Sequence, residues 1–244
     1  MNKLFLDVNK RDIKNKVLVA GFHGIGSVGW ITVNFLCDKL KARRIGIIVT
    51  DNIPLFAARK EDFIVTPYEL YLAENFLFLK CNMPVSSEEA YSVLKYVIDL
   101  VNEEAIKEAF LIGGLDSRLK KENDEKIRYI CTRSLHQNLN DKIVKNKRLT
   151  KLEKGLYVVG PLALLLIYFE ALKVPTLTIL PYAKIDRPDP EAASEAVKIF
   201  SYIYDRKIDY LDLIEQAKEV ERYLNEIQKK LEEMRKEESK LIYI

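Results

Sequence analysis

Residues 16–22 read KVLVAGF, a near-continuous apolar run that ends at a glycine turn, and this run restricts the fold more than any other stretch of the 244-residue chain. A strand with apolar side chains on both faces must be covered on both sides, as in a sheet between two layers of helices. Runs with a similar strand-like pattern recur at 44–50, 63–74, 75–83, 109–114, 126–132 and 176–182. Helical patterns separate several of these runs, so the sequence predicts an α/β fold.

Helix start signals support this prediction. Ser86 and Glu89 have the spacing of a capping box, and Pro190 occupies the first turn of a helix that begins at Asp189. Further helices are expected after the glycine turn and over residues 161–173. We therefore expect residues 1–208 to form a three-layer αβα sandwich with a mixed, mostly parallel sheet, followed by a long C-terminal helix.

Composition and charge exclude several classes of protein. The chain has 39 Lys and Arg against 36 Asp and Glu, with both signs interspersed, which is typical of a solvated surface and predicts no nucleic-acid partner. The most apolar stretch, 162–169, is eight residues long and far too short to cross a membrane. The N-terminus lacks a signal-peptide pattern, and Cys37, Cys81 and Cys131 form no CxxC pair. These features predict a cytoplasmic protein with free thiols.

The glycine turn offers the sharpest enzyme hypothesis. Gly24, Gly26 and Gly29 match G-x-G-x-x-G between a predicted strand and a predicted helix, and Asp51 follows the next strand. Such glycines let a pyrophosphate approach a helix N-terminus, so a nucleotide- or dinucleotide-binding enzyme is one reading of the chain. The same glycines also suit a tight turn that binds no ligand.

Other signals of catalysis are scarce. Ser27 and Val28 stand where a P-loop needs Lys and Ser or Thr, so no Walker motif is present. The two histidines, His23 and His136, have no partner at metal-ligand spacing, and no Cys-His nucleophile motif occurs. We predict no catalytic residues, no cofactor and no bound metal.

A heptad seam runs through the predicted C-terminal helix, residues 209–241. Asp209 is a candidate N-cap, and no Gly or Pro interrupts the run. The apolar positions follow in steps of four and three at Leu213, Ala217, Val220, Leu224, Ile227, Leu231, Met234 and, after Glu238, Leu241. This spacing predicts a coiled-coil contact with another chain or an antiparallel helix. An amphipathic helix that lies on its own domain is the alternative.

The last three residues, Ile242, Tyr243 and Ile244, follow a strongly charged stretch. An apolar side chain, a tyrosine and a terminal carboxylate can dock together: the first fills a cleft, the phenol hydrogen-bonds and the carboxylate pairs with a lysine. We predict that residues 242–244 are a partner-binding tail. A solvated tail without function is the alternative.

Four stretches together resemble the proteasome-assembly-chaperone family, specifically its archaeal branch. They are GFHGIGSVG at 21–29, FLIGGLDSRLKKEND at 110–124, VVGPLALLLIYFEALKVPTLTILPYA at 158–183 and IDRPDPEAASEAVKIF at 185–200. The resemblance implies an α/β sandwich without established catalysis that forms homo-oligomers, for which we favour a tetramer. It also implies that a hydrophobic-tyrosine-any (HbYX) tripeptide inserts between α-subunits of the 20S proteasome, which here concerns Ile242, Tyr243 and Ile244 only.

The expected function is therefore an ATP-independent, non-enzymatic proteasome-binding factor, either an activator or an assembly chaperone. Two alternatives stay open. The nucleotide-binding enzyme predicts a thermal shift with nucleotides, and a general ATP-independent holdase predicts that the apolar helix faces matter while Tyr243 does not.

Overall fold

A computed structural model describes residues 2–60, 63–122, 124–125, 127–137, 141–219 and 222. Six α-helices are defined there: α1 (Val28–Lys39), α2 (Ser87–Asn102), α3 (Arg133–Gln137), α4 (Asp141–Lys145), α5 (Gly160–Ala171) and α6 (Pro190–Ile203). Residues 211–219 are also helical. No helix among these described residues combines the length and apolar character needed to cross a membrane.

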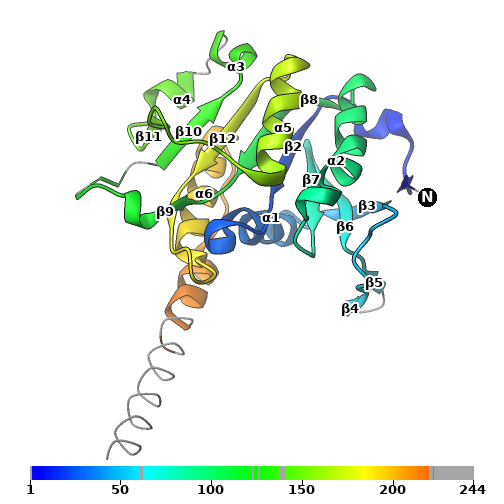
Figure 1. The fold of residues 1–244 in the computed structure, drawn as a ribbon, viewed down its shortest axis with the longest axis horizontal. Coiled ribbons are helices and arrows are strands. Elements are labelled where there is room, and N and C mark those ends of the chain that lie inside the picture. Colours follow the sequence, from blue (N-terminus) through cyan, green and yellow to red (C-terminus); the bar gives the residue numbers. More distant parts are fainter. Residues whose placement is uncertain are drawn as a thin grey trace, which may run out of the picture.

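The central sheet has nine strands in the order β1-β3-β6-β7-β2-β8-β12-β10-β11 (Figure 1). They are β1 (Lys3–Leu6), β2 (Lys16–Gly21), β3 (Arg43–Val49), β6 (Tyr68–Ala73), β7 (Phe76–Cys81), β8 (Ile106–Ile112), β10 (Ile127–Cys131), β11 (Leu149–Lys151) and β12 (Thr176–Leu180). Two small ribbons complete the described strands: β4 (Ala58–Lys60) with β5 (Phe63–Val65), and β9 (Leu115–Asp116) with β13 (Tyr182–Ala183).

Helices cover both faces of the sheet, which confirms the predicted layers. Along β2, Val17 and Val19 face the apolar cluster under α1 and α6, whereas Leu18 and Ala20 face the cluster under α2 and α5. From Val17 to Gly21 each residue is therefore buried on one face or the other, which is why the sequence of β2 carries no polar side chain after Lys16.

The sheet is mixed, but the prediction that it is mostly parallel was wrong. Among its described neighbours, four strand pairs are parallel and four are antiparallel. The hairpin between β6 and β7 accounts for one antiparallel pair, and β1, β3 and β10 add the others by pairing with strands distant in sequence.

The helix caps follow the sequence signals. The Ser86 hydroxyl accepts a hydrogen bond from the Glu89 amide at 3.2 Å, and Asp189 accepts one from the Ala192 amide at 3.0 Å. Of the predicted long C-terminal helix, residues 209–241, the structure describes 209–219 and Arg222; residues 209 and 210 precede the helical stretch 211–219, and the remainder lies outside the described residues.

Candidate functional site

The glycine turn connects β2 to α1 at the carboxyl end of the parallel strands, where α/β proteins bind ligands. A Cβ on Gly29 would lie 2.4 Å from the carbonyl oxygen of Ile112 and 2.8 Å from the Cα of Gly21. Only glycine therefore lets the first turn of α1 lie directly on β2 and β8. The third glycine of the motif has a packing role.

Neighbouring segments also fill the space around Gly26. This residue has φ +60°, and a Cβ there would lie 2.7 Å from the Cβ of Ala183. Its carbonyl accepts a hydrogen bond from the Asp189 amide at 2.8 Å, and Gly114 lies so close to Ile25 that a Cβ on Gly114 would be 2.3 Å from the Ile25 oxygen. Protein backbone thus lies against the turn on two sides. Gly24 differs, because a Cβ there would meet no atom within 4 Å.

Asp51 lies far from the glycines across the sheet. It follows β3, and β6 and β7 separate β3 from β2 in the strand order. Three strand spacings place the two strands roughly 14 Å apart. In a dinucleotide-binding fold the acidic residue follows the strand adjacent to the glycine turn, so the geometry of Gly24, Gly26, Gly29 and Asp51 does not support that alternative.

His23 lies within the turn and stacks on Trp30, with ring centroids 4.8 Å apart and planes inclined by 29°. Burial lowers the pKa of His23, because the charged imidazolium loses its hydration. Its Nδ1 and the Nε1 of Trp30 are buried without a hydrogen-bond partner in the described structure. Across the described ranges, no group of three or more His, Cys, Asp or Glu side chains is placed to hold a metal ion.

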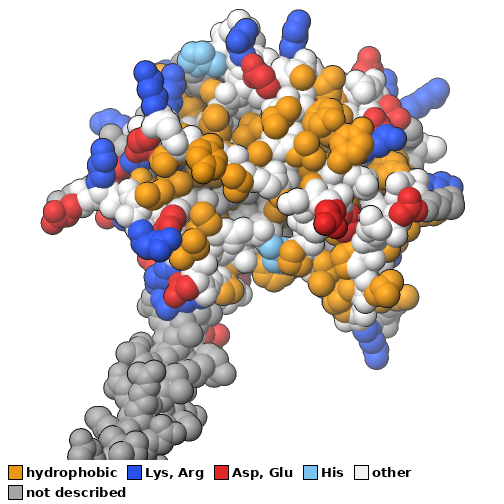
Figure 2. Space-filling view, viewed as in Figure 1, with side chains coloured by type: hydrophobic (Ala, Val, Ile, Leu, Met, Phe, Trp, Pro, Cys, Tyr) orange, Lys and Arg blue, Asp and Glu red, His pale blue; other side chains and the backbone are white. Residues whose placement is uncertain are grey.

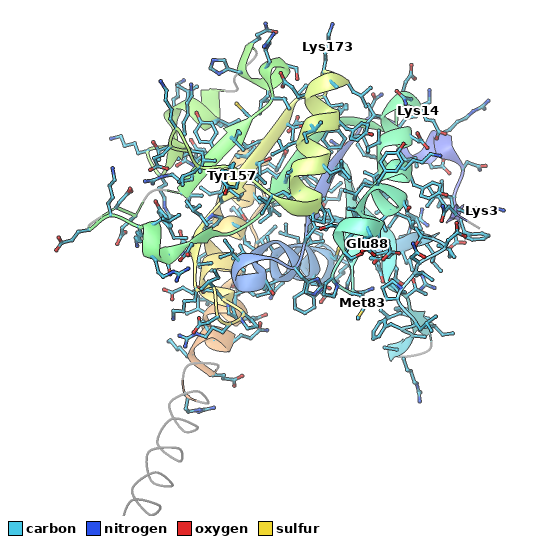
Figure 3. All side chains as sticks on the ribbon, in the orientation of Figure 1. Lys3, Lys14, Met83, Glu88, Tyr157 and Lys173 are labelled. Carbon is cyan, nitrogen blue, oxygen red and sulfur yellow. The ribbon has the colours of Figure 1, made fainter. Side chains whose placement is uncertain are left out.

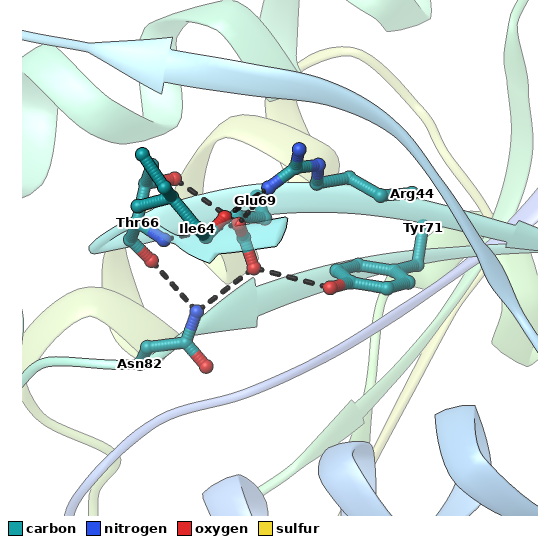
Figure 4. A network of polar contacts seen from close by, with 6 residues as sticks. All are labelled: Arg44, Ile64, Thr66, Glu69, Tyr71 and Asn82. Atoms are coloured by element: carbon teal, nitrogen blue, oxygen red, sulfur yellow. Dashed lines mark hydrogen bonds and ion pairs between the residues drawn. The ribbon is translucent and has the colours of Figure 1, made fainter. Parts of the chain in front are cut away.

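A buried carboxylate, Glu69 on β6, is the centre of a polar network two strands away from β2 in the sheet (Figure 4). It accepts hydrogen bonds from Arg44 Nη1 at 2.9 Å, the Thr66 amide at 3.0 Å, Tyr71 Oη at 3.2 Å and Asn82 Nδ2 at 3.0 Å. Each of these donors belongs to the same chain, so the carboxylate is fully engaged in holding strands together. The network is structural, and the sequence had given no sign of it.

The same arginine fixes the ribbon of β4 and β5 to the sheet. Arg44 Nη1 donates a second hydrogen bond to the carbonyl of Ile64 at 2.6 Å, and its guanidinium lies 5.2 Å from the ring centre of Phe63. A two-stranded ribbon is marginally stable alone, so these contacts at its base determine its position.

An open groove of about 750 Å³ lies between β10, β11 and α5. Its lining is mainly apolar and includes Ile130, Leu152, Leu156, Leu166 and Ile167. Arg133, His136, Lys151 and Glu170 stand among the polar lining residues. Sequence reasoning missed this groove, because its shape depends on how β10, β11 and α5 pack together, which the pattern of each segment does not show.

The start of the predicted C-terminal helix is attached to the body of the protein. The Leu211 amide donates to the Asp209 carboxylate at 3.0 Å, as expected for an N-cap. Leu213 is 1% exposed and belongs to the apolar cluster under α1 and α6, while Lys39 pairs with Asp212 at 2.6 Å. The first seam position therefore packs on its own domain.

After Leu213, only Ala217 of the seam positions is described, and it is half-buried. Val220, Leu224, Ile227, Leu231 and Met234 lie outside the described residues, as do Ile242, Tyr243 and Ile244. The coiled-coil seam and the docking tail remain predictions.

These observations define a three-layer α/β protein whose glycine turn is a packing contact. The chain belongs to the PAC2 family, whose model matches residues 18–228. This confirms the resemblance found in the sequence. No curated protein matches the chain.

Solved structures with the same fold include two proteins from Pyrococcus furiosus. PbaA, described as an archaeal homolog of proteasome-assembly chaperone, is 19% identical with a TM-score of 0.81, over 97% of this chain and 96% of PbaA. PbaB, described as an archaeal proteasome activator, is 18% identical with a TM-score of 0.79, over 93% of this chain and 98% of PbaB. A proteasome-assembly chaperone homologue from Mycobacterium tuberculosis is 12% identical with a TM-score of 0.61, over 86% of this chain and 94% of the homologue. At these identities the likeness shows the fold.

Proposed function

We propose that this protein is a non-enzymatic, ATP-independent factor that binds the 20S proteasome, as an activator or an assembly chaperone. The observation that carries the proposal is the PAC2 match over residues 18–228, followed by a chain end that reads Ile242-Tyr243-Ile244. The fold shared with PbaA and PbaB, whose descriptions name a proteasome-assembly chaperone homolog and a proteasome activator, supports it.

In the proposed mechanism, the tail enters a pocket between two α-subunits of the core particle. Ile242 fills the apolar part, Tyr243 hydrogen-bonds through its phenol, and the carboxylate of Ile244 pairs with a basic side chain. The sequence contains no Walker motif, so binding energy alone would drive any opening of the gate. Several tails on one oligomer would raise a weak single-tail affinity through effective concentration.

The structure of the body is compatible with a mechanism in which the body holds the start of the C-terminal segment and the tail binds the proteasome. Leu213 and the ion pair between Lys39 and Asp212 fix residues 211–219 to the α1 and α6 side of the sandwich. The chain that follows residues 211–219 therefore starts from a defined place on the body, and in the proposed mechanism its last three residues bind the partner.

Peptide hydrolysis by a purified archaeal 20S core particle tests the proposal. Intact protein should stimulate hydrolysis, and Tyr243→Ala should abolish the stimulation, because the variant loses the phenol and its ring contacts. Tyr202→Ala is the matched control, since Tyr202 is an exposed tyrosine on α6, and it should stimulate like the intact protein.

Binding of the core particle to immobilised protein distinguishes the two proposed roles. Binding that depends on Tyr243 without stimulation would favour assembly over activation. Absence of both binding and stimulation would refute the proteasome proposal. Binding that persists in Tyr243→Ala would show that the tail is not the docking element.

A further inference from the structure

Helix α5 is apolar on every side, although only one side packs on the sheet. Its sequence, GPLALLLIYFEA, has a single charged residue, and Leu162, Leu165 and Phe169 are the positions buried against the sheet. On the outward side Ile167 is 65% exposed, and Tyr168 lies 6.2 Å from the exposed Tyr91 of α2. Figure 2 shows hydrophobic side chains gathered over this side of the molecule.

The exposed apolar side of α5 forms a ridge, and two further features of shape lie beside it. The groove beside α5 is the first, and it follows the flank of the helix that carries Leu166 and Ile167. The second is Tyr157, which precedes α5 and is 81% exposed (Figure 3). The face therefore presents a ridge, a hollow and a projecting aromatic side chain. We call it the α5 face, and define it by Tyr91, Tyr157, Ile167, Tyr168 and the groove.

Charges at the two ends of the α5 face are opposite. Both α2 and α5 run opposite to the parallel strands that follow them, β8 and β12, so the two helices begin at the same edge of the sheet. Glu88, in the first turn of α2, is thus at one end of the face, and Lys173, just after α5, is at the other (Figure 3). Both side chains are exposed.

From these features we infer that the α5 face binds the α5 face of a second copy of this chain, around a two-fold axis that makes the two α5 helices antiparallel. Such an axis exchanges the ends of the face, so Lys173 of each copy approaches Glu88 of the other. It also brings Tyr157, beside the N-terminal end of α5, toward the groove along the second copy's α5. A self-complementary patch of this kind is what a two-fold interface requires.

A second copy explains the face better than a charged partner. An exposed apolar ridge is unusual on the surface of a monomer, and α5 itself has a single charged residue, while the groove beside it carries side chains of both signs and so favours neither an acidic nor a basic protein. Pairing through α5 also leaves the opposite side of the sandwich uncovered, where α1, α6 and residues 211–219 lie. The C-terminal segments of both copies would therefore stay accessible to the proteasome. The inference rests on the proposed function, because that function needs several tails in one assembly. Its test, however, measures self-association and does not involve the proteasome.

Molecular mass in solution, measured by light scattering on a size-exclusion column, tests the interface. The intact protein should have a mass of at least two chains, and Ile167→Asp should raise the dissociation constant of the pair on the order of 100-fold or more, because each pair buries two such residues. Ile64→Asp is the matched control, since Ile64 is 60% exposed on β5, and its mass should stay that of the intact protein. Circular dichroism verifies that both variants are folded.

Charge reversal tests the antiparallel arrangement separately. Glu88→Lys and Lys173→Glu should each raise the dissociation constant by about five-fold, and the double variant should restore it, because each exposed pair contributes modestly. An intact protein that is monomeric, or an Ile167→Asp variant with unchanged mass, would overturn the interface. A double variant that stays weakened would overturn the antiparallel arrangement. A monomer that still stimulates the core particle would refute this inference while leaving the proposed function intact.

Discussion

At the scale of single residues, the Glu69 carboxylate shows how the protein accommodates a buried charge. Glu69 is fully buried, and its partner Arg44 is largely shielded from solvent. Four residues donate to the carboxylate, and its removal would leave the largely shielded Arg44 guanidinium without its counter-charge. Loss of one member of a buried ion pair costs more than the pair itself contributes.

We therefore expect Glu69→Ala to lower the free energy of unfolding by about 3–5 kcal/mol, measured by urea denaturation. Glu104→Ala is the control, because Glu104 pairs with Lys14 at 2.8 Å on the exposed surface. Exposed pairs contribute roughly 0–1 kcal/mol, so this variant should unfold like the intact protein. Equal losses in the two variants would show that the Glu69 network adds nothing beyond a surface pair.

At the scale of elements, local signals predicted what local interactions determine. The capping box starts α2 and Pro190 opens α6, as their sequences indicated. Pairings between distant segments could not be predicted. β1 reads KLFL and is antiparallel to β3, yet nothing in either segment indicates this partner or its register.

At the candidate site, too, local structure could be predicted from the sequence, whereas contacts between distant segments could not. G-x-G-x-x-G predicted a strand, a turn and a helix, and all three are present. Whether such a turn binds a ligand depends on the order of the strands and on what packs against the glycines. Ala183 and Gly114 come from segments far along the chain, so sequence spacing could not show that protein fills this space.

The helical segment 211–219 contacts the body through the buried side chain of Leu213 as well as through the ion pair between Asp212 and Lys39. Leu213→Ala should lower the free energy of local opening of this segment by about 2–5 kcal/mol, because it removes a leucine buried between the segment and the body. Hydrogen exchange measures the effect: amides of 211–219 should exchange faster, while those of β2 and β8 stay unchanged.

Leu211→Ala provides the matched control, since Leu211 lies in the same segment and is 59% exposed. It should leave exchange in 211–219 near that of the intact protein. Equal acceleration by both variants would mean that helix propensity, and not the contact of Leu213 with the body, holds the segment.

At the scale of the whole molecule, a body that pairs through α5 and carries a tail on each copy should bind the core particle through several weak contacts at once. Linking binding elements raises overall affinity by 10²–10⁴ without any new contact, according to the effective concentration of the second tail. The number of tails per assembly should therefore matter as much as the sequence of each tail.

Mixing intact protein with an excess of Tyr243→Ala protein, after exchange of subunits, tests this expectation. Most intact chains would then be paired with a chain whose tail cannot dock, so the concentration of intact chains needed for half-maximal stimulation should rise on the order of ten-fold or more. The same excess of a Tyr243→Ala protein that also carries Ile167→Asp should have no effect, because that chain cannot pair through α5. If both mixtures behaved alike, the tails would act singly, and pairing would contribute nothing to docking.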